Sequence, residues 1–498
     1  MSSSETVEAE LQPVAAVVVL AAGGGTRMKS SKSKLLHEVA GKSLLSFALS
    51  AASALDPEHL VVVVGHQREQ VLEHLEGMPI AITTAVQEQQ NGTGHAVECG
   101  LAGLGELTGE VVVTYGDVPM LTGETLRELV AAHRAQFNQI TILSARVPDP
   151  TGYGRIVRNG DVVARIVEHK DASDAERAIT EINSGIYVFD AGVLRHGLDN
   201  LDTDNAQGEL YLTDVITIAN REGGRVGAMV TEDIWQTEGV NDRVQLARMG
   251  HEMNRRILDR WMLAGVTITD PNSTWIDVDV DLSPDVTLLP GTILKGATSV
   301  ASGATIGPDT MLTDVEVGAG ASVVRAHGSL AVIGEDASVG PFAFLRPGTE
   351  LGAKGKIGTF VETKNAVIAP GAKVPHLAYA GDAIIDEGAN IGAGTIFANY
   401  DGVHKSTTHV GRNAFVGSNS VLVAPLDLGD GAFVAAGSTI TNDVPPGALA
   451  VARGRQNNVE GWIAKRRPGS KWDEAAIDAA EQPHPAVAES RAKVEQGK

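Results

Sequence analysis

A glycine-rich loop near the start of the chain is the first stretch whose residues could do chemistry. The run Gly23–Gly25 follows a continuous apolar segment, and four basic side chains come soon after it: Arg27, Lys29, Lys32 and Lys34. Backbone N–H groups in such a loop can wrap phosphate oxygens, and nearby cations would neutralise their charge. A purely structural strand-to-helix turn would contain the same glycines, so the loop alone does not decide between the two readings.

Two familiar phosphate motifs do not fit this region. Met28 stands where the dinucleotide-binding fingerprint places its third glycine. Gly41-Lys42-Ser43 looks like the end of a P-loop, but Leu36 occupies the position of the first glycine in that motif. The sequence therefore supports neither an NAD site nor a P-loop, and leaves a flexible backbone with cations beside it.

The loop is positioned by a predicted α/β domain over residues 14–240. Buried strands are expected at 14–20, 59–65, 80–85, 111–115 and 140–145, with helices at 43–55, 67–76, 94–101 and 122–136. Alternating strands and helices of these lengths predict a parallel, Rossmann-like sheet. Ligands of such sheets lie at the carboxyl ends of the strands, where Gly23–Arg27 and Gly116-Asp117 both fall.

A single helix is predicted between this domain and the rest of the chain. Five apolar residues recur three or four positions apart: Leu246, Met249, Met253, Ile257 and Trp261. This spacing places them on one face of a helix, and Gly265 fits a helix stop. Residues 241–265 therefore read as a linker helix.

After this helix the chain keeps a six-residue rhythm. An aliphatic residue followed by Gly recurs at multiples of six within uninterrupted runs, as at Val317-Gly318, Ile333-Gly334, Val339-Gly340, Leu351-Gly352, Ile357-Gly358, Ile391-Gly392, Val410-Gly411, Val416-Gly417 and Leu428-Gly429. This is the hexapeptide signature of a parallel β-helix. The aliphatic side chain is expected to point inward, and the glycine to take turn angles that a Cβ would penalise. The domain is predicted over 266–455, irregular until about residue 290.

Two stretches break the rhythm, 363–382 and 397–409. Solenoids carry their insertions on one side, often the binding side. Residues that could do chemistry collect around both stretches, so both are predicted to be excursions from the coils that carry a site.

The two ends of the chain read as tails. Residues 1–13 are acidic and polar, and are predicted to be disordered. Residues 456–498 begin with a short arm that contains the basic cluster Lys465–Arg467, and continue as a polar, alanine-rich and proline-interrupted segment. That composition predicts a largely disordered tail.

Composition limits the function further. The formal net charge is −22, which argues against a general nucleic-acid binder. Cys99 is the single cysteine, so there is no internal disulfide, and a small buried hydrophobe is its simplest reading. The chain has no apolar run long enough for a membrane span and no basic-then-apolar start, so a cytoplasmic protein is expected.

The motifs, taken in order, resemble a known family. Leu20–Met28 and Lys34–His37 are similar to the L-A-A-G-x-G-T-R-M…P-K-x-L-H signature of sugar-nucleotide pyrophosphorylases. Further matching motifs follow at Gln87, 92–96, 115–119, 153–156, 166–168, 183–186 and 238–241. With the repeat domain attached, residues 14–465 resemble bacterial bifunctional N-acetylglucosamine-1-phosphate uridylyltransferases/glucosamine-1-phosphate N-acetyltransferases, whose repeat domain is a left-handed β-helix. Ser33 replaces the usual proline of the family and Asn91 the usual leucine.

For the first domain, the resemblance implies attack of a sugar-1-phosphate on the α-phosphorus of UTP. Such a reaction depends on positioning and on charge neutralisation. Arg27 and Lys34 correspond to the phosphate-binding pair. Asp117 and Asn241 correspond to ligands of Mg²⁺, with Mn²⁺ as the alternative, and Mg²⁺ prefers such oxygens. The full UTP and product set implied is Leu20, Ala21, Ala22, Gly23, Lys34, Gln87, Gly92, Thr93, Tyr115, Gly116, Asp117, Gly154, Glu168, Asn183 and Asn241. Within it, Gln87 and Gly92-Thr93 would read uracil, and Gly154, Glu168 and Asn183 would hold the sugar.

For the second domain, the resemblance implies acetyl transfer from acetyl-CoA to the amine of glucosamine-1-phosphate. His376 corresponds to the general base, and the pKa of an imidazole suits that task near neutrality. The acceptor-binding residues implied are Arg346, Lys364, Tyr379 and Asn390. The acetyl-CoA contacts implied are Ala393, Asn399, Tyr400, Lys405, Ser418, Ala436 and Arg453, with Asn399 and Tyr400 also orienting the sugar.

The resemblance also implies a homotrimer whose acetylation sites are shared between subunits. Two other interpretations stay open at this point. A single-activity pyrophosphorylase could carry a β-helix that only oligomerises or regulates, although His376, Lys364 and Arg346 are all present. A non-enzymatic β-helical scaffold would need a degenerate first domain, and the nucleotide-site motifs argue against that.

Overall fold

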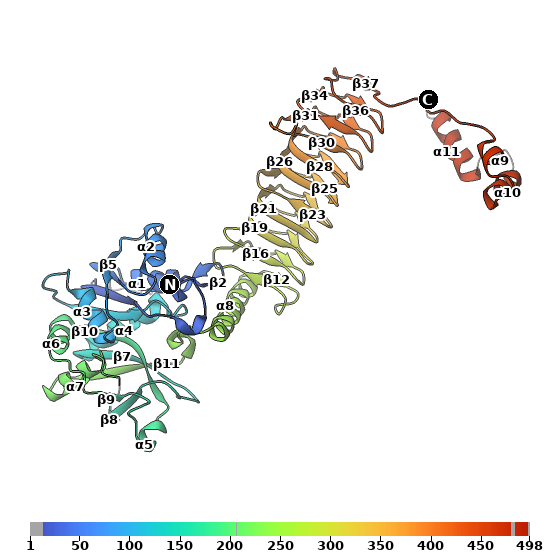
Figure 1. Ribbon diagram of the computed structural model, residues 1–498. Coiled ribbons are helices and arrows are strands. Elements are labelled where there is room, and N and C mark those ends of the chain that lie inside the picture. Colours follow the sequence, from blue (N-terminus) through green and yellow to red (C-terminus); the bar gives the residue numbers. More distant parts are fainter. Residues whose placement is uncertain (1–12, 206, 480–483, 497–498) are drawn as a thin grey trace, which may run out of the picture.

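The computed structural model describes residues 13–205, 207–479 and 484–496 (Figure 1). An α/β head leads through one long helix into a straight β-helical prism, and the last helices lie beyond its far end. Within the described ranges, no helix is long and apolar enough to cross a membrane. The predicted N-terminal tail lies outside these ranges except for Pro13.

The head is built on a nine-stranded sheet in the order β11-β7-β10-β6-β1-β4-β5, with β8 and β9 attached beside β10. Its strands are β1 (Ala16–Ala21), β4 (His59–Val64), β5 (Thr83–Val86), β6 (Glu110–Tyr115), β7 (Ile140–Arg146), β8 (Arg155–Asn159), β9 (Val162–Val167), β10 (Glu181–Asp190) and β11 (Val226–Thr231). Its helices are α1 (Leu44–Ser53), α2 (Arg68–Glu76), α3 (Thr93–Leu101), α4 (Gly123–Ala135), α5 (Asp174–Arg177), α6 (Ala191–Asp199) and α7 (Asp214–Arg221). The strands and helices predicted from the sequence are confirmed, although β5 begins at Thr83 rather than at residue 80.

The sheet is not wholly parallel. β1 pairs in parallel with β4 and β6, as predicted, so its buried valines lie between two other apolar strands. β10 runs antiparallel to both β6 and β7, and β8 runs antiparallel to β9. β8, β9 and β10 come after the predicted strands and helices in the chain. They extend the sheet beyond the parallel strands β1, β4 and β6.

Helix α8 (Arg243–Leu263) and a small hairpin join the head to the prism. The hairpin strands are β2 (Glu38–Val39) and β3 (Lys42–Ser43). Val278 N donates to Ala40 O at 3.0 Å, and Lys42 Nζ lies 2.6 Å from Asp279 Oδ1. One buried apolar cluster runs from Val39 and Val240 through the inner face of α8 into the first coils. The two domains therefore share a core at their junction.

The prism consists of short parallel strands stacked in three faces, a left-handed parallel β-helix. One face contains β12 (Thr267–Ile268), β15 (Thr287–Leu288), β18 (Thr305–Ile306), β20 (Ser322–Val323), β22 (Ser338–Val339), β25 (Lys356–Thr359), β27 (Lys373–His376), β29 (Asn390–Ile391), β32 (Phe415–Val416), β35 (Phe433–Val434) and β37 (Leu449–Ala450). The other two faces contain β13 (Trp275–Ile276), β14 (Asp281–Leu282), β16 (Ile293–Lys295), β17 (Ser299–Val300), β19 (Met311–Val317), β21 (Ala326–Ile333), β23 (Ala343–Leu345), β24 (Thr349–Leu351), β26 (Glu362–Ile368), β28 (Tyr379–Ile385), β30 (Ile396–Ala398), β31 (Thr408–Val410), β33 (Val421–Val423), β34 (Leu426–Leu428) and β36 (Thr439–Ile440).

The hexad aliphatics fill the interior as predicted, but the reason predicted for the glycines is wrong at most positions. Gly334 and Gly411 do not adopt positive φ. A Cβ on Gly334 would instead lie 2.7 Å from Ala353 N, and one on Gly411 would lie 2.6 Å from Asp430 N. These glycines let the backbones of successive coils approach closely. Close approach, like positive φ, is a reason for a residue without a Cβ.

One of the two predicted interruptions is also wrong. Residues 363–382 form regular coil, because Ile357 pairs with Val374 and Thr363 with Ala380. Residues stacked in these successive coils are separated by one residue fewer than three hexads. Corner residues with left-handed backbone, such as Asn365 and Asp382, accommodate the missing residue. The second interruption is confirmed: a short loop at 399–406 leaves the coil, closed by a bridge between Tyr400 and Lys405.

The C-terminal region differs from the predicted disorder. It contains α9 (Trp462–Arg466), α10 (Lys471–Asp478) and α11 (Pro485–Gln496). Ser470 caps α10 by accepting a hydrogen bond from Asp473 N at 3.3 Å. The Arg467 guanidinium lies over the rings of Trp462 and Trp472. Alanine supplies no core, yet it has the highest helix propensity.

Candidate active sites

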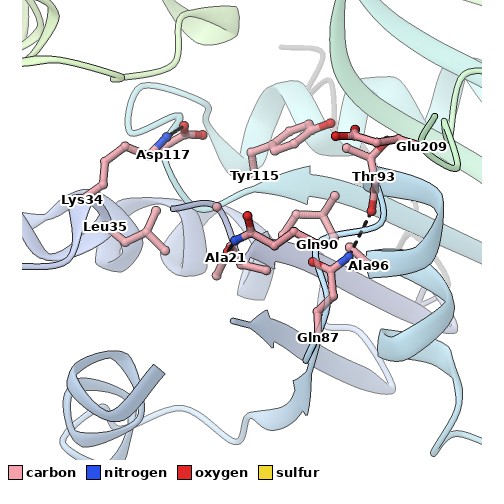
Figure 2. A pocket seen from close by; sticks show the side chains of 14 residues that line it. Ala21, Lys34, Leu35, Gln87, Gln90, Thr93, Ala96, Tyr115, Asp117 and Glu209 are labelled. Atoms are coloured by element: carbon pink, nitrogen blue, oxygen red, sulfur yellow. Dashed lines mark hydrogen bonds and ion pairs between the residues drawn. The ribbon is translucent and has the colours of Figure 1, made fainter. Parts of the chain in front are cut away.

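The first candidate site is a cavity of about 310 Å³ at the carboxyl ends of β1 and β6 (Figure 2). Ten residues of the predicted nucleotide set line it: Leu20, Ala21, Ala22, Gly23, Lys34, Gln87, Gly92, Thr93, Tyr115 and Asp117. Four further lining residues were not predicted: Leu35, Gln90, Ala96 and Glu209. The carboxyl end of β1 and the N-terminus of α3 thus face one another across a space that suits a nucleotide.

The glycine-rich loop has a specific steric requirement. Gly25 adopts φ +54°, and a Cβ there would lie 2.8 Å from Lys34 Cβ. The loop then forms a 3₁₀ turn at Thr26–Met28, and a second one at Lys34–Leu36 brings Lys34 back to the cavity. A left-handed residue without a Cβ is therefore needed to place Lys34 beside the loop.

Lys34, Asp117 and Asn241 converge at one end of the cavity. The Lys34 ammonium forms an ion pair with Asp117 Oδ2 and lies 3.4 Å from Asn241 Oδ1 (Figure 2 shows the first pair). Asn241 is held by a 2.7 Å bond from its own N–H to Gln245 Oε1 at the start of α8. Two side-chain oxygens from distant parts of the chain thus surround a single cation, here an ammonium.

The same two oxygens fit a hard divalent ion. Among the described residues, no group of three or more His, Cys, Asp or Glu side chains could hold a metal. A site of one carboxylate and one amide suits Mg²⁺, which usually keeps several waters and shares substrate phosphates. The donors present are therefore compatible with the metal implied by the resemblance.

The opposite end of the cavity presents amide groups. Gln87 Nε2 donates to Gly92 O at 3.0 Å (Figure 2). The same Nε2 lies 3.2 Å from His95 Nδ1. Gln90 Nε2 donates to Ala22 O at 2.7 Å, which ties the segment before α3 to the end of β1. A buried amide in this position can read the polar edge of a base.

The three predicted sugar residues form a separate cluster. Asn183 N donates to Gly154 O at 2.9 Å, and a Cβ on Gly154 would lie 3.2 Å from Glu168 Oε1. Burial raises the pKa of the Glu168 carboxyl, and the carboxylates of Asp171 and Asp214 raise it further. The ring of Tyr115 packs against Gly185, beside this cluster, and also lines the nucleotide cavity. Tyr115 therefore connects the two groups of residues.

Besides Asn241 and the three sugar residues, two more predicted residues of the first domain do not line the cavity. Gly116 acts through its backbone, because its N–H donates to Leu20 O at 3.0 Å and joins the ends of β1 and β6. Arg27 is exposed on the 3₁₀ turn. The two departures from the family pattern leave the site intact: Ser33 N donates to Gln70 Oε1 at 2.9 Å, and Asn91 uses its backbone carbonyl to bind Leu210 N.

In the prism, the predicted residues lie along two different edges. The cationic edge consists of Arg346, Lys364 and Lys405, and the third of these comes from the loop at 399–406. Contact with the Lys405 ammonium lowers the pKa of Lys364, and the charge of Arg346 lowers it further. Glu362 pairs with Arg346 at 2.9 Å, and Asn399 is tied to Asp382 at 2.5 Å. Three cations gathered in this way form a candidate anion site.

The His376 edge consists of His376, Ala393, Ser418, Ala436 and Arg453. Backbone bonds connect the coils there: Gly394 N donates to His376 O, Asn419 N to Ala393 O, and Gly437 N to Ser418 O. Arg453 Nη1 donates to Ala436 O at 2.9 Å. His376 itself is exposed, and small side chains line the edge beyond it, which leaves room for an extended chain to lie against backbone.

The remaining predicted residues lie between or beside the edges. Tyr379 begins β28 on the face between them, and its hydroxyl lies over Gly381. Asn390 is on β29, next to Lys373 of the strand that ends at His376. Tyr400 is 59% exposed on the loop. One chain therefore places the predicted base and the predicted phosphate contacts on separate edges, with Lys405 grouped with Lys364 rather than with the small residues.

A nucleotidyltransferase head joined to a hexapeptide prism defines a two-site transferase. The family model of the MobA-like NTP transferase domain matches residues 17–181. A Bifunctional protein GlmU of Kineococcus radiotolerans is 56% identical over 94% of this chain and 96% of its own length. Proteins of the same name from Streptomyces avermitilis and Paenarthrobacter aurescens are 56% and 55% identical over 94% and 97% of this chain, and 98% of each relative is covered. The chain therefore belongs to the bifunctional GlmU family. It is a bifunctional enzyme with uridylyltransferase and acetyltransferase activities.

Proposed function

We propose that the chain transfers acetyl from acetyl-CoA to glucosamine-1-phosphate and then transfers uridylyl from UTP to the product, N-acetylglucosamine-1-phosphate. The second reaction releases pyrophosphate and forms UDP-N-acetylglucosamine, a precursor for cell-wall synthesis. The observation that carries this proposal is the convergence of Lys34, Asp117 and Asn241 at one end of a nucleotide-sized cavity. The separate His376 edge supplies a base in the other domain.

In uridylyl transfer, an oxygen of the sugar phosphate forms a bond to the α-phosphorus of UTP as the bond to pyrophosphate breaks. Lys34 neutralises charge that develops on the transferred group, and Gln87 orients uracil. Asp117 and Asn241 would hold Mg²⁺, with Mn²⁺ as the alternative, and the ion supplies further neutralisation of phosphate charge. Gly154, Glu168 and Asn183 keep the sugar in line.

In acetyl transfer, the amine nitrogen attacks the thioester carbonyl, the C–S bond breaks, and CoA leaves as a thiolate that takes up a proton. His376 accepts the proton from the amine. Arg346, Lys364 and Lys405 bind the sugar phosphate, while the small residues of the His376 edge accommodate the pantetheine arm. Tyr379 and Asn390 orient the sugar.

A reaction that starts from the unacetylated sugar tests this order. The full chain is incubated with glucosamine-1-phosphate, UTP and Mg²⁺, with and without acetyl-CoA, and the products are separated by chromatography. UDP-N-acetylglucosamine should form only with acetyl-CoA, and one free thiol should appear per product. Release of no thiol would instead support a single-activity pyrophosphorylase with a structural β-helix.

We propose further that the chain forms a homotrimer with shared acetylation sites. The two predicted halves of the acetylation site lie on separate edges of one prism, so an edge of a second chain could complete each site. The outer faces also carry exposed apolar side chains, including the stacked pair Phe415 and Phe433.

Light scattering combined with dilution tests the trimer. The scattering mass should be three times that of the chain at assay concentration. Acetyl transfer per chain should fall on dilution below the dissociation range, while uridylyl transfer should not. A monomer with full acetyl transfer would contradict the shared site.

A further inference from the structure

Arg155 is a buried cation in the head that the reaction described above does not use. Its side chain is 1% exposed, and no carboxylate in the described part of the chain forms an ion pair with it. Nη1 donates to Tyr153 O, Nη2 lies 3.2 Å from His169 Nδ1, and Nε is buried without a partner among the described residues. The charges of Asp149 and Glu168 act on Arg155 without direct contact. Burying a charge without a directly paired carboxylate is costly, so packing alone does not explain this residue.

The strand register places Arg155 at the meeting point of the sugar cluster. Arg155 pairs with Val167 of β9, which is followed by Glu168, and with Ile182 of β10, which is followed by Asn183. Gly154 precedes it directly. The guanidinium thus joins the turn that contains Gly154 to the segment that contains Glu168, through Tyr153 O and His169.

We propose that Arg155 is a positioning residue that holds the Gly154 turn and the Glu168 segment together, so that the Glu168 carboxylate faces the hydroxyl and N–H donors of an amino-sugar phosphate. This inference rests on the proposed uridylyl transfer. Arg155 does not touch substrate in this arrangement. It acts through Tyr153 O on one side and through His169 on the other.

The electrostatics of Glu168 support this role. Burial, Asp171 and Asp214 raise the pKa of its carboxyl, and the charge of Arg155 opposes them. Burial raises the pKa values of the phenols of Tyr115, Tyr187 and Tyr211, and the Glu168 charge raises them further. Since the folded pKa of Glu168 is already raised, its carboxylate is lost as pH falls through that pKa. Removal of the Arg155 charge would move this loss to higher pH.

The test compares Arg155→Met with Arg158→Met on the same strand, whose guanidinium instead pairs with Glu181. Arg155→Met should raise KM for N-acetylglucosamine-1-phosphate by about tenfold, the effect of losing hydrogen bonds to a charged group. KM for UTP should change less than about twofold. The acid limb of kcat/KM for the sugar phosphate should move up by about one pH unit. Arg158→Met should leave the KM ratio and the pH profile unchanged.

Arg155→Lys separates charge from geometry. It should return the acid limb to its wild-type position but leave KM for the sugar phosphate raised, because one ammonium cannot replace both guanidinium contacts. An unchanged KM for UTP in the same full-length variants reports that the head is folded. If Arg155→Met is poorly folded, Arg155→Lys and His169→Ala still test the contact, since each should raise the same KM.

An unchanged sugar-phosphate KM in either folded Arg155 variant, or an unmoved acid limb in folded Arg155→Met, would overturn the inference. Glu168→Gln distinguishes this failure from failure of the proposed function. If Glu168→Gln raises KM for the sugar phosphate and the Arg155 variants do not, only the role of Arg155 is wrong. If Glu168→Gln also has no effect, the sugar site itself is misplaced and both proposals fail.

Discussion

His376→Ala should abolish acetyl transfer to glucosamine-1-phosphate while uridylyl transfer continues at the wild-type rate. The side chain is exposed at the end of β27, beside the row of small residues that leaves room for acetyl-CoA. Loss of a general base costs a factor of at least about one hundred in rate. Thiol release from acetyl-CoA and pyrophosphate release from UTP, measured on the same preparation, check the two activities.

A second histidine provides the matched control for this variant. His327 is also exposed on the prism, on β21, away from the His376 edge. His327→Ala should leave both activities unchanged. Normal acetyl transfer in His376→Ala would remove His376 from the reaction, and loss of both activities would indicate a damaged fold.

Asp117→Ala should silence uridylyl transfer and leave acetyl transfer intact. The carboxylate pairs with Lys34 beside Asn241, so its loss leaves one oxygen to hold a divalent ion and frees the Lys34 ammonium. A decrease of at least about a hundredfold in kcat is expected when such an electrostatic group is removed. Pyrophosphate release as a function of Mg²⁺ and of Mn²⁺ concentration measures both the loss and the metal preference.

Chelation gives an independent check of the same site. Removal of divalent ions from the wild-type enzyme should stop uridylyl transfer and spare acetyl transfer, because the His376 and cationic edges use protein groups alone. Asp161→Ala, in an exposed turn of the head, should behave as wild type. Uridylyl transfer that survives both Asp117→Ala and chelation would refute the assignment of a metal to this cavity.

Short-range sequence patterns predict much of the fold. The six-residue rhythm fixes the interior column of the prism because every inward aliphatic meets its equivalent one coil away, as Ile306 meets Val323. The strands of the head are continuous apolar runs, and β1 and β4 follow them closely. The rhythm could not reveal what happens when a coil is one residue short. The sequence suggests a loop at 363–382, whereas corner residues such as Asn365 and Asp382 take up the difference by left-handed backbone.

The site was predictable where residues carry a motif and unpredictable where only the tertiary structure brings them in. Lys34, Gln87 and Asp117 line the cavity as expected. Glu209 lines it as well, although it lies far along the chain in a polar segment with no phosphate-binding pattern. Its signal is indirect: backbone bonds join Leu210 to Asn91 and Gly94, beside the motif that begins α3. The spacing of motifs also could not show that the predicted site residues of the second domain lie on two edges of the prism.

The regular stacking of coils sets the axial distances along the prism. Neighbouring parallel strands lie about 4.8 Å apart, and six steps separate β12, next to the head, from β27, which ends at His376. The axial distance from the start of the prism to His376 is therefore about 29 Å on that spacing. Insertion or removal of one complete coil between β12 and β22, before Arg346 in the chain, would change the separation of the two active centres by a single increment. The composition of each centre would be unaltered, so the distance over which the acetylated intermediate must travel can be varied independently of the chemistry at either end.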